Sequence, residues 1–586
     1  MPELRMRGAG TPSPLRLRSP LRVRVRRALA SLAGVLALLL LVTACSGIPR
    51  SGPVEVGDAI GTDDDIDVIF LAADPIPGAS PQEILNGFIL AAKSPQNDYE
   101  IARRYLTRSA ADSWKPNAGT RVDTGTRPIT EVDSTTLSLS ITPVATVNAN
   151  GSYSEAPSNA PTALDFTLQQ VDGEWRIDRL EDGIVIEDLF FDQVFSSHAL
   201  YFYDPTFTYL VPDLRWFPTS TAVGTRIVKA LLTGPSAWLG DGAVVTAFPD
   251  GTTTTAVVTS GGQSQVELSS NVLQADANDL QRMQYQLSAS LSDLASASNV
   301  AISVDQNVVP IPGSNVAEPE ASPRVDSRAL VLRDGAFGYV AGPAVSPIPG
   351  ISDGVELLQA ESAAYSATSH TAAVRGAGGV VSAVRSNAAG AVSAPVTLDA
   401  RADLIDPAVD PFGYVWSVPA EQPTEVVAYG PDGTALPITT TWDGASGITA
   451  LEISRDGARA LALLSAGAQS RLVVAAVIRD QDGVPQRLGQ PLELGSPAGA
   501  PLDATWVDQL TVAAAGQLSS GETRVGARML GGRGTPLGSP ANAVSLAGGN
   551  DLDGLRVLSA EGELLQQRGS VWQTITTGVT RLAVQN

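Results

Sequence analysis

Few side chains in this sequence of 586 residues could carry nucleophilic or metal-dependent chemistry. There is one cysteine, Cys45, and there are two histidines, His198 and His370. A single cysteine excludes an intramolecular disulfide and a cysteine-rich zinc site, and a two-histidine site would need distant segments to converge. Ser-His or Cys-His catalysis would depend on the same two histidines, and the sequence shows no nucleophile–histidine pair on one segment. Without a glycine-rich phosphate loop either, we predict no catalytic residue, no metal ligand and no cofactor.

Three carboxylates near one another in the sequence leave an alternative open. Asp403, Asp406 and Asp410 could pair for general acid/base work on glycans, as two carboxylates do in glycoside hydrolases. Asp406-Pro407 and Asp410-Pro411 are also ordinary turn signals. The turn interpretation is the simpler one, and it makes these residues edge and turn acids without chemistry.

The cysteine follows a segment that is typical of an export signal. The first 27 residues are rich in Arg, and residues 28–42 form an apolar run of 15, which is short for a membrane-spanning helix of about 20 residues. The run ends in Val42-Thr43-Ala44-Cys45, which resembles the bacterial lipobox. That resemblance implies cleavage between Ala44 and Cys45, a diacylglyceryl thioether on the Cys45 sulfur and an acylated Cys45 amine. The chain would then be held on the extracytoplasmic face of the cell membrane, exported by the general secretory route in preference to the twin-arginine route.

The charge of the chain is strongly asymmetric. The formal net charge is −22, but residues 1–44 contain eight arginines and one acid. The remaining 542 residues hold 31 basic and 60 acidic side chains, a net charge of −29. A body this acidic repels phosphate backbones, so we exclude nucleic acid as a partner. Hydrophobic residues make up 44 % of the chain, which excludes disorder over its whole length.

A small α+β domain is predicted over residues 81–195, after a tether over residues 45–80 that is rich in Pro, Gly and Asp. Pro81 begins a helix, and the spacing of Ile101, Tyr105 and Leu106 predicts a second helix that ends near Trp114. Alternating strands follow, and Asp172-Gly173 predicts a hairpin turn between two of them. The order of two helices and then a hairpin sheet resembles cone-shaped domains of the nuclear-transport-factor-like type.

Residues 198–310 predict an α/β domain. Hydroxyls of residues 219–221 should cap a helix over residues 223–232, and Gly234-Pro235 should end it. Strands are expected at 201–203, 210–218, 244–248, 255–258, 265–268 and 300–304, and a second helix at 275–295. The order of elements, together with Leu231-Leu-Thr-Gly-Pro235, Phe248-Pro-Asp-Gly-Thr252 and Val266-Glu-Leu-Ser269, resembles the GerMN domain. That family is found on the outer side of membranes and has no catalysis established for the class.

The C-terminal region changes to all-β patterning after a linker over residues 311–324. In residues 325–586 short alternating runs begin at 329, 370, 413, 458, 510 and 555, with spacings of 41, 43, 45, 52 and 45. A four-stranded propeller blade takes about 40–45 residues, so this region predicts a β-propeller of about six blades. A pair of β-sandwiches is the alternative.

The whole order resembles the LpqB family of actinobacterial lipoproteins: lipobox, small α+β domain, GerMN domain, propeller. The resemblance implies a regulatory lipoprotein that binds the outer domain of an MtrB-like sensor histidine kinase. It would thereby influence two-component signalling, cell-wall homeostasis and division.

A cell-wall or polysaccharide-binding lipoprotein is the second hypothesis, and a propeller hydrolase or lyase is the third. Wall binding would call for exposed aromatic residues. Aromatics are only 5 % of the chain, and four tryptophans recur at positions expected for blade cores: Trp416, Trp442, Trp506 and Trp572.

Overall fold

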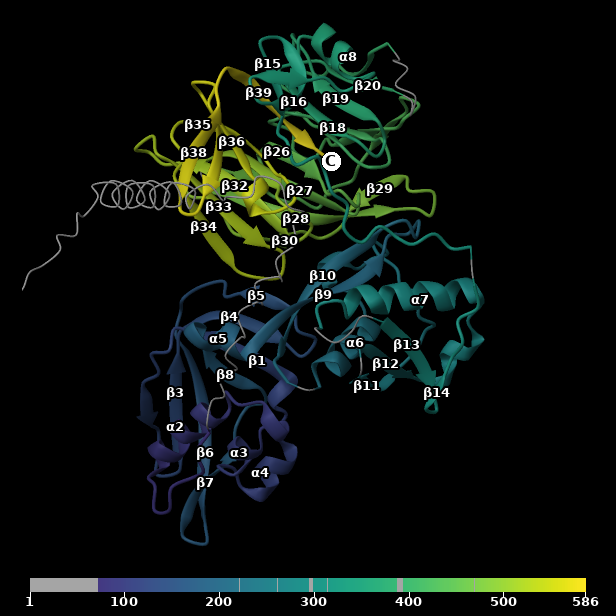
Figure 1. Cartoon of the computed structure of the whole chain (residues 1–586). Coiled ribbons are helices and arrows are strands. Elements are labelled where there is room, and N and C mark those ends of the chain that lie inside the picture. The colour runs from purple at the N-terminus through teal and green to yellow at the C-terminus, as the bar shows by residue number, and fades with distance from the viewer. Residues whose placement is uncertain are drawn as a thin grey trace, which may run out of the picture. The chain divides into compact units, whose positions relative to one another are not determined.

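Three consecutive regions follow one another in the computed structural model, which describes residues 72–586 apart from 221, 261, 295–298, 314, 387–393 and 468 (Figure 1). The described residues belong to one compact unit of the chain. Cys45, the predicted signal peptide and most of the predicted tether lie outside the described residues.

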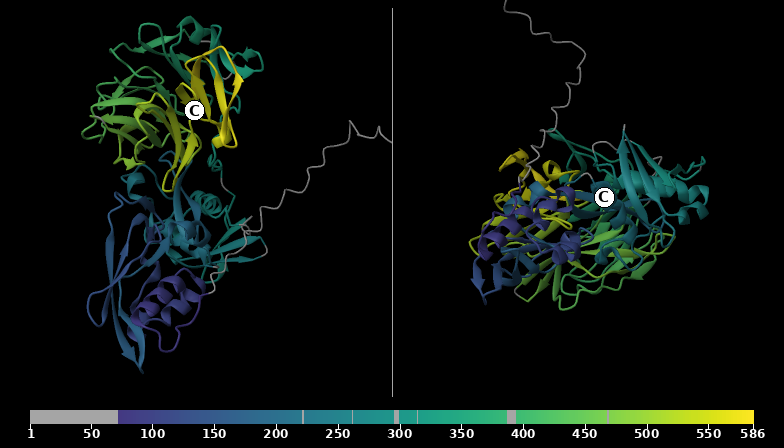
Figure 2. Two further views of the ribbon diagram at one scale, coloured as in Figure 1. Left: turned by 90° about the vertical axis from the view of Figure 1, so that its left-hand side faces the viewer. Right: turned by 90° about the horizontal axis from the view of Figure 1, so that it is seen from below.

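The N-terminal region is α+β. Its strands form two four-stranded sheets, β5-β4-β1-β8 and β2-β3-β6-β7. Figure 2 shows its first helices (purple) beside these strands (blue). The elements are α2 (Pro81–Ala91), α3 (Glu100–Arg103), α4 (Arg108–Ser113), β1 (Gly119–Asp123), β2 (Ile129–Glu131), β3 (Thr136–Ile141), β4 (Pro143–Asn148), β5 (Tyr153–Glu155), β6 (Thr162–Val171), β7 (Glu174–Arg179), β8 (Ile184–Glu187) and α5 (Asp188–Val194).

Helix α2 begins at Pro81, as predicted. The N-cap residue Ser80 accepts a hydrogen bond from the Glu83 backbone, and the Glu83 carboxylate accepts one from the Ser80 backbone, which completes a capping box. Ile84 and Phe88 on one face of the helix are buried. The helix is therefore fixed both by its cap and by the core beneath it.

The prediction of one continuous second helix is wrong, because the segment forms two separate helices. Helix α3 ends at Arg103, and Thr107 caps a separate helix, α4. The chain breaks between them because Tyr105 and Thr107 bond to strand β7: the Ile177 N–H donates to the Tyr105 carbonyl, and the Thr107 N–H donates to the Ile177 carbonyl. Tertiary pairing with a strand overrides the helical spacing of Ile101, Tyr105 and Leu106.

The hairpin predicted at Asp172-Gly173 is confirmed. Both residues have positive φ, 53° and 84°, as a two-residue type I′ turn requires. Strands β6 and β7 pair in antiparallel register on either side of it.

The central region contains an antiparallel pair, β10-β9, and a four-stranded sheet, β11-β12-β13-β14. Helices α6 and α7 pack on these strands. The elements are β9 (Phe195–Tyr203), β10 (Leu210–Pro218), α6 (Val223–Thr233), β11 (Thr254–Ser260), β12 (Gln263–Leu268), α7 (Ala277–Ser290), β13 (Asn299–Val304) and β14 (Asn307–Val308).

Three details of the central region differ from the sequence prediction. Helix α6 has Ala222 as its N-cap with no side-chain cap, and the Ser220 hydroxyl is buried without a partner among the described residues. Residues 244–248 form only an isolated bridge, in which Val245 pairs antiparallel with Tyr203, and beyond it the Ala247 N–H donates to the side chain of Gln286 at 3.0 Å. Helix α7 ends at Ser290 and continues as a tighter turn that still buries Leu291. Gly234, with φ 111°, ends α6 as predicted.

The C-terminal region is built almost wholly of strands. The sheet order runs β17-β16-β15-β39-β18-β19-β20-β21, followed by separate sheets β22-β23-β24-β25, β26-β27-β28-β29 (with β30 beside β28), β31-β32-β33-β34 and β35-β36-β37-β38. The strands are β15 (Leu330–Arg333), β16 (Ala336–Ala341), β17 (Ala344–Ser346), β18 (Ser362–Ser366), β19 (Thr371–Arg375), β20 (Val381–Arg385), β21 (Val396–Asp399), β22 (Ala408–Val409), β23 (Val415–Ser417), β24 (Val427–Tyr429), β25 (Ala435–Pro437), β26 (Gly447–Ile453), β27 (Arg459–Ala466), β28 (Gln469–Arg479), β29 (Pro485–Leu488), β30 (Leu492–Glu493), β31 (Ala500–Trp506), β32 (Thr511–Gln517), β33 (Thr523–Met529), β34 (Gly534–Gly538), β35 (Ala543–Ala547), β36 (Arg556–Ser559), β37 (Leu564–Arg568), β38 (Val571–Thr576) and β39 (Val579–Gln585). An α-helix, α8 (Ser352–Leu357), and a 3-10 helix over Leu552–Gly554 accompany them.

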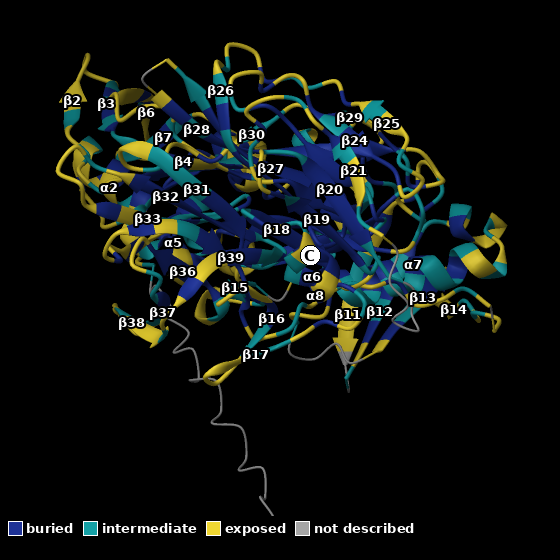
Figure 3. Cartoon of the chain, turned by 90° about the horizontal axis from the view of Figure 1, so that it is seen from above, coloured by how far each residue is buried: buried dark blue, intermediate teal, exposed yellow. Residues whose placement is uncertain are grey.

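The repeated runs in the sequence mark the same place in successive sheets. They fall on β15, β19, β23, β27, β32 and β36. Each of these is the second strand of its four-stranded sheet, counted from the inner edge, if β39 is taken as the innermost strand of the sheet that contains β15, β16 and β17. These strands are largely buried, whereas outer strands such as β38 are exposed (Figure 3). Strand β39 pairs antiparallel with β15, so the last strand of the region joins its first.

Candidate functional site

The inner strands of the C-terminal region surround a cavity of about 220 Å³, called here the axial cavity. Strands β18, β22, β26, β31, β35 and β39 all contribute to its lining. Most of the residues that line it are apolar, but three carboxyl groups belong to it: Asp406, Glu452 and Asp503. No Lys or Arg is among the described residues that line it, and Arg375, which pairs with Asp406, lies outside the lining.

Glu452 is the most deeply enclosed of these acids. It lies on β26 with a relative exposure of 8 %, and one carboxyl oxygen accepts hydrogen bonds from the Trp506 N–H at 2.9 Å and the Thr505 hydroxyl at 3.1 Å. Burial raises the pKa of Glu452 to about 8, and the nearby charge of Asp503 adds to that rise. Glu452 is therefore mostly protonated, and neutral, at pH 7.

Asp503 provides a second proton-holding group from the neighbouring sheet. Its two carboxyl oxygens accept from the Ala504 N–H at 2.8 Å and the Leu546 N–H at 2.7 Å. Burial raises the pKa of Asp503 to about 7, with a smaller contribution from the charge of Asp406. Asp503 keeps partial contact with solvent, so Glu452 is the stronger case of a buried neutral acid.

Replacing Glu452 with Gln is expected to stabilise the protein at high pH. The pKa of Glu452 is higher in the folded protein than in the unfolded chain, so the folded protein holds a proton that the unfolded chain releases. The free energy of unfolding therefore falls as the pH rises from about 5 to 8. Gln is neutral throughout and can keep the bonds from Trp506 and Thr505. Denaturant unfolding should show the variant more stable by about 3 kcal/mol at pH 8 and nearly equal at pH 5.

The exposed Glu421 provides the control, since Glu421→Gln should leave the pH profile unchanged. Equal destabilisation of Glu452→Gln at pH 5 and pH 8 would contradict a neutral Glu452.

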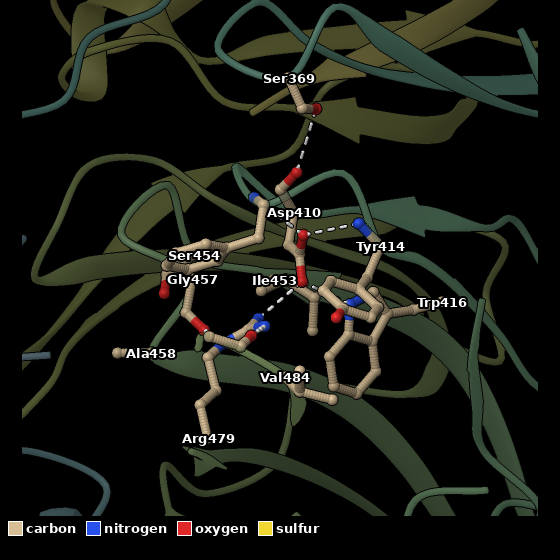
Figure 4. Close-up of polar contacts among 12 residues, drawn as sticks. Ser369, Asp410, Tyr414, Trp416, Ile453, Ser454, Gly457, Ala458, Arg479 and Val484 are labelled. Atoms are coloured by element: carbon tan, nitrogen blue, oxygen red, sulfur yellow. Dashed lines mark hydrogen bonds and ion pairs between the residues drawn. The ribbon is translucent and has the colours of Figure 1, made fainter. Parts of the chain in front are cut away.

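The three carboxylates suggested for glycan chemistry do not come together. Asp410 is fully buried: one oxygen accepts from the Phe412 and Tyr414 N–H groups, and the other from the Trp416 indole at 3.0 Å and Arg479 at 2.6 Å (Figure 4). Its acceptor positions are thus occupied by the protein.

Asp406 and Asp403 have separate surroundings. The exposed carboxylate of Asp406 pairs with Arg375 at 2.7 Å, and Asp403 lies in a turn with φ 55°. No contact links any two of the three carboxylates in the described part of the chain. The geometry favours the turn and edge interpretation for all of them.

The histidines lie in different regions, and one has a neighbour that the sequence analysis missed. His198 on β9 has its Nε2 atom 2.9 Å from the Ser196 hydroxyl, so a hydroxyl–histidine pair does exist on one segment. Its Nδ1 atom is buried without a partner among the described residues, so no carboxylate orients the ring, and burial lowers its pKa. His370 lies in the turn between β18 and β19.

In the part of the chain that the structure describes, no group of three or more His, Cys, Asp or Glu side chains is arranged to hold a metal ion. None of the helices described has both the length and the apolar character of a membrane span.

The tryptophans expected in blade cores are mostly where the sequence placed them. Trp416, Trp442 and Trp506 are buried, whereas Trp572 is partly exposed and its indole donates to the Leu537 carbonyl at 2.9 Å. The sequence missed Glu452 and Asp503. An acid inside an apolar strand, as in Leu451-Glu452-Ile453, was the available signal.

Three family models match consecutive parts of the chain. Residues 74–192 match the N-terminal domain of lipoprotein LpqB, residues 199–309 match the sporulation and spore germination domain called Germane, and residues 335–582 match the LpqB β-propeller domain. The first GerMN domain of GerM from Bacillus subtilis is similar at 17 % identity, with a TM-score of 0.18, covering 22 % of this chain and 97 % of that one.

Proteins named lipoprotein LpqB are similar over parts of their length. The one from Thermobifida fusca is 31 % identical over 52 % of this chain and 53 % of its own, and the one from Streptomyces coelicolor is 25 % identical over 75 % and 78 %. The chain thus spans about half the length of the first of these relatives.

Taken together, these features define a multidomain lipoprotein with a GerMN-like central domain and a β-propeller region. The chain belongs to the LpqB family. These relatives are named as lipoproteins, and neither name is that of an enzyme.

Proposed function

We propose that this protein is a non-catalytic lipoprotein, anchored through Cys45 on the extracytoplasmic face of the membrane, that docks on the outer domain of an MtrB-like sensor histidine kinase. The observation that carries the proposal is the structural use of Asp410. Asp410, one of the three acids considered for propeller chemistry, accepts hydrogen bonds from four donors of its own scaffold and is not free to bind a substrate. We therefore expect the propeller to act by binding a partner at its surface or in its cavity.

The junction between the regions supports a scaffold role. The Trp216 indole on β10 donates to the Gly531 carbonyl in the C-terminal region at 2.8 Å. Arg533 pairs with Asp188 on α5 at 2.8 Å. Contacts of this kind join the N-terminal, central and C-terminal regions.

We also infer the finer architecture that this function assumes. The placement of β39 beside β15 supports a propeller of six blades, with the last strand completing the first blade. Two sheets with helices α2 to α4 alongside support a cone of the nuclear-transport-factor-like type over residues 81–195. The domain limits 198–310 and 325–586 remain those that the sequence predicts.

Docking requires only weak contacts, because both proteins are held at one membrane. Tethering of this kind raises the effective concentration to about the millimolar range. A contact with a Kd of about 1–100 µM in solution would then bias a two-state sensor.

The test compares binding and signalling in one preparation. The purified chain should bind the kinase's immobilised outer domain saturably, and should change kinase autophosphorylation when both are reconstituted in vesicles. A His198→Ala, His370→Ala double variant should keep both properties, since docking needs no histidine chemistry. Loss of modulation in a folded double variant would favour an enzyme, and binding to isolated cell wall in place of the kinase would favour the polysaccharide-binding alternative.

A further inference from the structure

A second cavity, of about 340 Å³, opens where helix α6 faces strands β1 and β4 and the turn after β4. The end of β10 forms its inner wall. We call it the α6 cleft. Small-molecule sites typically measure about 300–1,000 Å³, so the α6 cleft reaches that range whereas the axial cavity, at about 220 Å³, does not.

The charge of the α6 cleft is opposite to that of the chain. Of the described residues that line it, none is Asp or Glu, and two are cations, Arg226 and Lys229. The whole chain has a net charge of −22 and contains only three lysines. An acid-free, cationic cleft in so acidic a protein attracts anions locally, while the surrounding surface repels them.

The two cations are close on helix α6 and are held differently. They are three positions apart, so they lie on one face of the helix. The Arg226 guanidinium donates to the side-chain oxygen of Asn117 at 2.7 Å. Asn117 belongs to the N-terminal region, so this bond holds the guanidinium at the cleft. Lys229 is exposed and pairs with no carboxylate of the described residues, so its ammonium is available to a ligand.

The polar rim adds further hydrogen-bond donors. The Asn148 side-chain oxygen accepts from the N–H groups of Asn150 and Ser152, at 2.9 and 3.0 Å, which leaves its NH₂ group to donate outward. Asn117 is in the same position, because its oxygen is used by Arg226. Amide NH₂ groups beside two cations suit a ligand with both negative charge and hydroxyl groups.

The inner wall of the cleft is rigid. Phe195, Trp216 and Phe217 are buried, and the Trp216 indole is fixed by its bond to Gly531. Gly151 has φ 83°, and a Cβ atom there would lie 2.9 Å from the Trp216 carbonyl, so only glycine lets the turn close on this wall. A preformed site loses less entropy when it binds.

We propose that the α6 cleft binds a small polyhydroxylated anion, a sugar acid or a sugar phosphate. Arg226 and Lys229 can bind the anionic oxygens of either a carboxylate or a phosphate, and the asparagine amides can donate hydrogen bonds to the hydroxyl groups. This site is independent of the kinase proposed as a partner, and a ligand bound in it would contact the N-terminal and central regions at once.

The test is calorimetric titration of the purified mature chain with glucuronate, glucose 1-phosphate and glucose. At least one of the two anions should bind, more weakly as salt is added, and glucose should not bind. Glucuronate alone would identify carboxylate as the ligand chemistry, and glucose 1-phosphate alone would identify phosphate. Arg226→Ala with Lys229→Ala should weaken binding about 100-fold, since each charge-assisted contact contributes about tenfold.

Lys115→Ala is the matched control, because Lys115 is exposed and does not line the cleft. It should bind as the unaltered chain does. If the double variant melts at a lower temperature, the affinity of the Lys229→Ala single variant is measured instead, and we expect it to bind about tenfold more weakly. Failure of both anions to bind at 10 mM (roughly the weak limit of a useful site), equal binding of glucose, or unchanged binding in the cleft variants would each overturn the proposal.

Discussion

Replacing Asp410 with Asn is expected to lower the free energy of unfolding by about 3–5 kcal/mol, the usual cost of leaving one member of a buried ion pair alone. For a region of this size, such a loss corresponds to a fall of roughly 10 °C in Tm. Thermal and denaturant unfolding of the purified chain would measure it.

The geometry around Asp410 explains why so small a change should cost so much. Asn can still accept from the Phe412 and Tyr414 backbones, but its NH₂ group then faces the Trp416 indole and Arg479, which are both donors. Arg479 is fully buried and also donates to the Gly457 and Gly483 carbonyls, so it cannot turn toward water. An unpaired guanidinium would remain inside the protein.

Two variants separate this pair from a general effect of losing an acid. Asp406→Asn removes an exposed carboxylate paired with Arg375, and should change stability by less than about 1 kcal/mol. Asp410→Asn combined with Arg479→Met should cost less than the sum of the single variants, because no buried charge is left over. If Asp410→Asn unfolds like the unaltered chain, the carboxylate is not structural, and its availability for chemistry would have to be reconsidered.

The strands of the propeller could be predicted because their periodicity is local. Runs such as Ala458–Leu463 are buried on both sides and recur at blade spacing, so they mark the second strand of each sheet. The pairing of β39 with β15 joins residues about 250 positions apart, and no local pattern records it. The same holds for Asp410 and Arg479, whose bond spans 69 positions.

The errors in the central and N-terminal regions have a common cause. Residues 244–248 alternate like a strand, yet only Val245 pairs with a strand, through Tyr203, and the Ala247 N–H bonds to the Gln286 side chain. The helical spacing around Tyr105 is interrupted because β7 offers backbone partners at that point. In each case a group distant in sequence satisfied the backbone better than the local periodic structure.

The candidate site was harder to predict than the fold. Sequence reasoning weighed Asp403, Asp406 and Asp410 because they are close in the chain, and only Asp406 lines the axial cavity. Glu452 and Asp503 reach that cavity from sheets about 50 residues apart, and their shared burial depends on closure of the whole region. Arg226 and Asn117 in the α6 cleft likewise meet across 109 positions.

The second large effect concerns the anchor. Cys45→Ser is expected to abolish lipid attachment, because Cys45 is the only cysteine and its thiol is the atom that a diacylglyceryl group would modify. Each buried CH₂ contributes about 0.8 kcal/mol, so two or three acyl chains bind a membrane stably where one chain binds only marginally. Labelling of cells with a tagged fatty acid should mark the unaltered protein and leave the Cys45→Ser variant unmarked.

Partition between membrane and soluble fractions tests the same anchor. The Cys45→Ser variant could stay at the membrane through an uncleaved signal peptide, so a chain that lacks this signal is used. Residues 46–586, exported behind an ordinary cleavable signal peptide, should appear in the soluble fraction, whereas the unaltered chain should stay with membranes through high-salt washing. Ser46→Ala is the control, since it changes the adjacent residue and keeps the thiol, and it should label and partition normally. Label on Cys45→Ser, or salt-resistant membrane binding of residues 46–586, would mean that the protein is held by something other than a lipid on Cys45, and the tethering that makes weak docking sufficient would need another source.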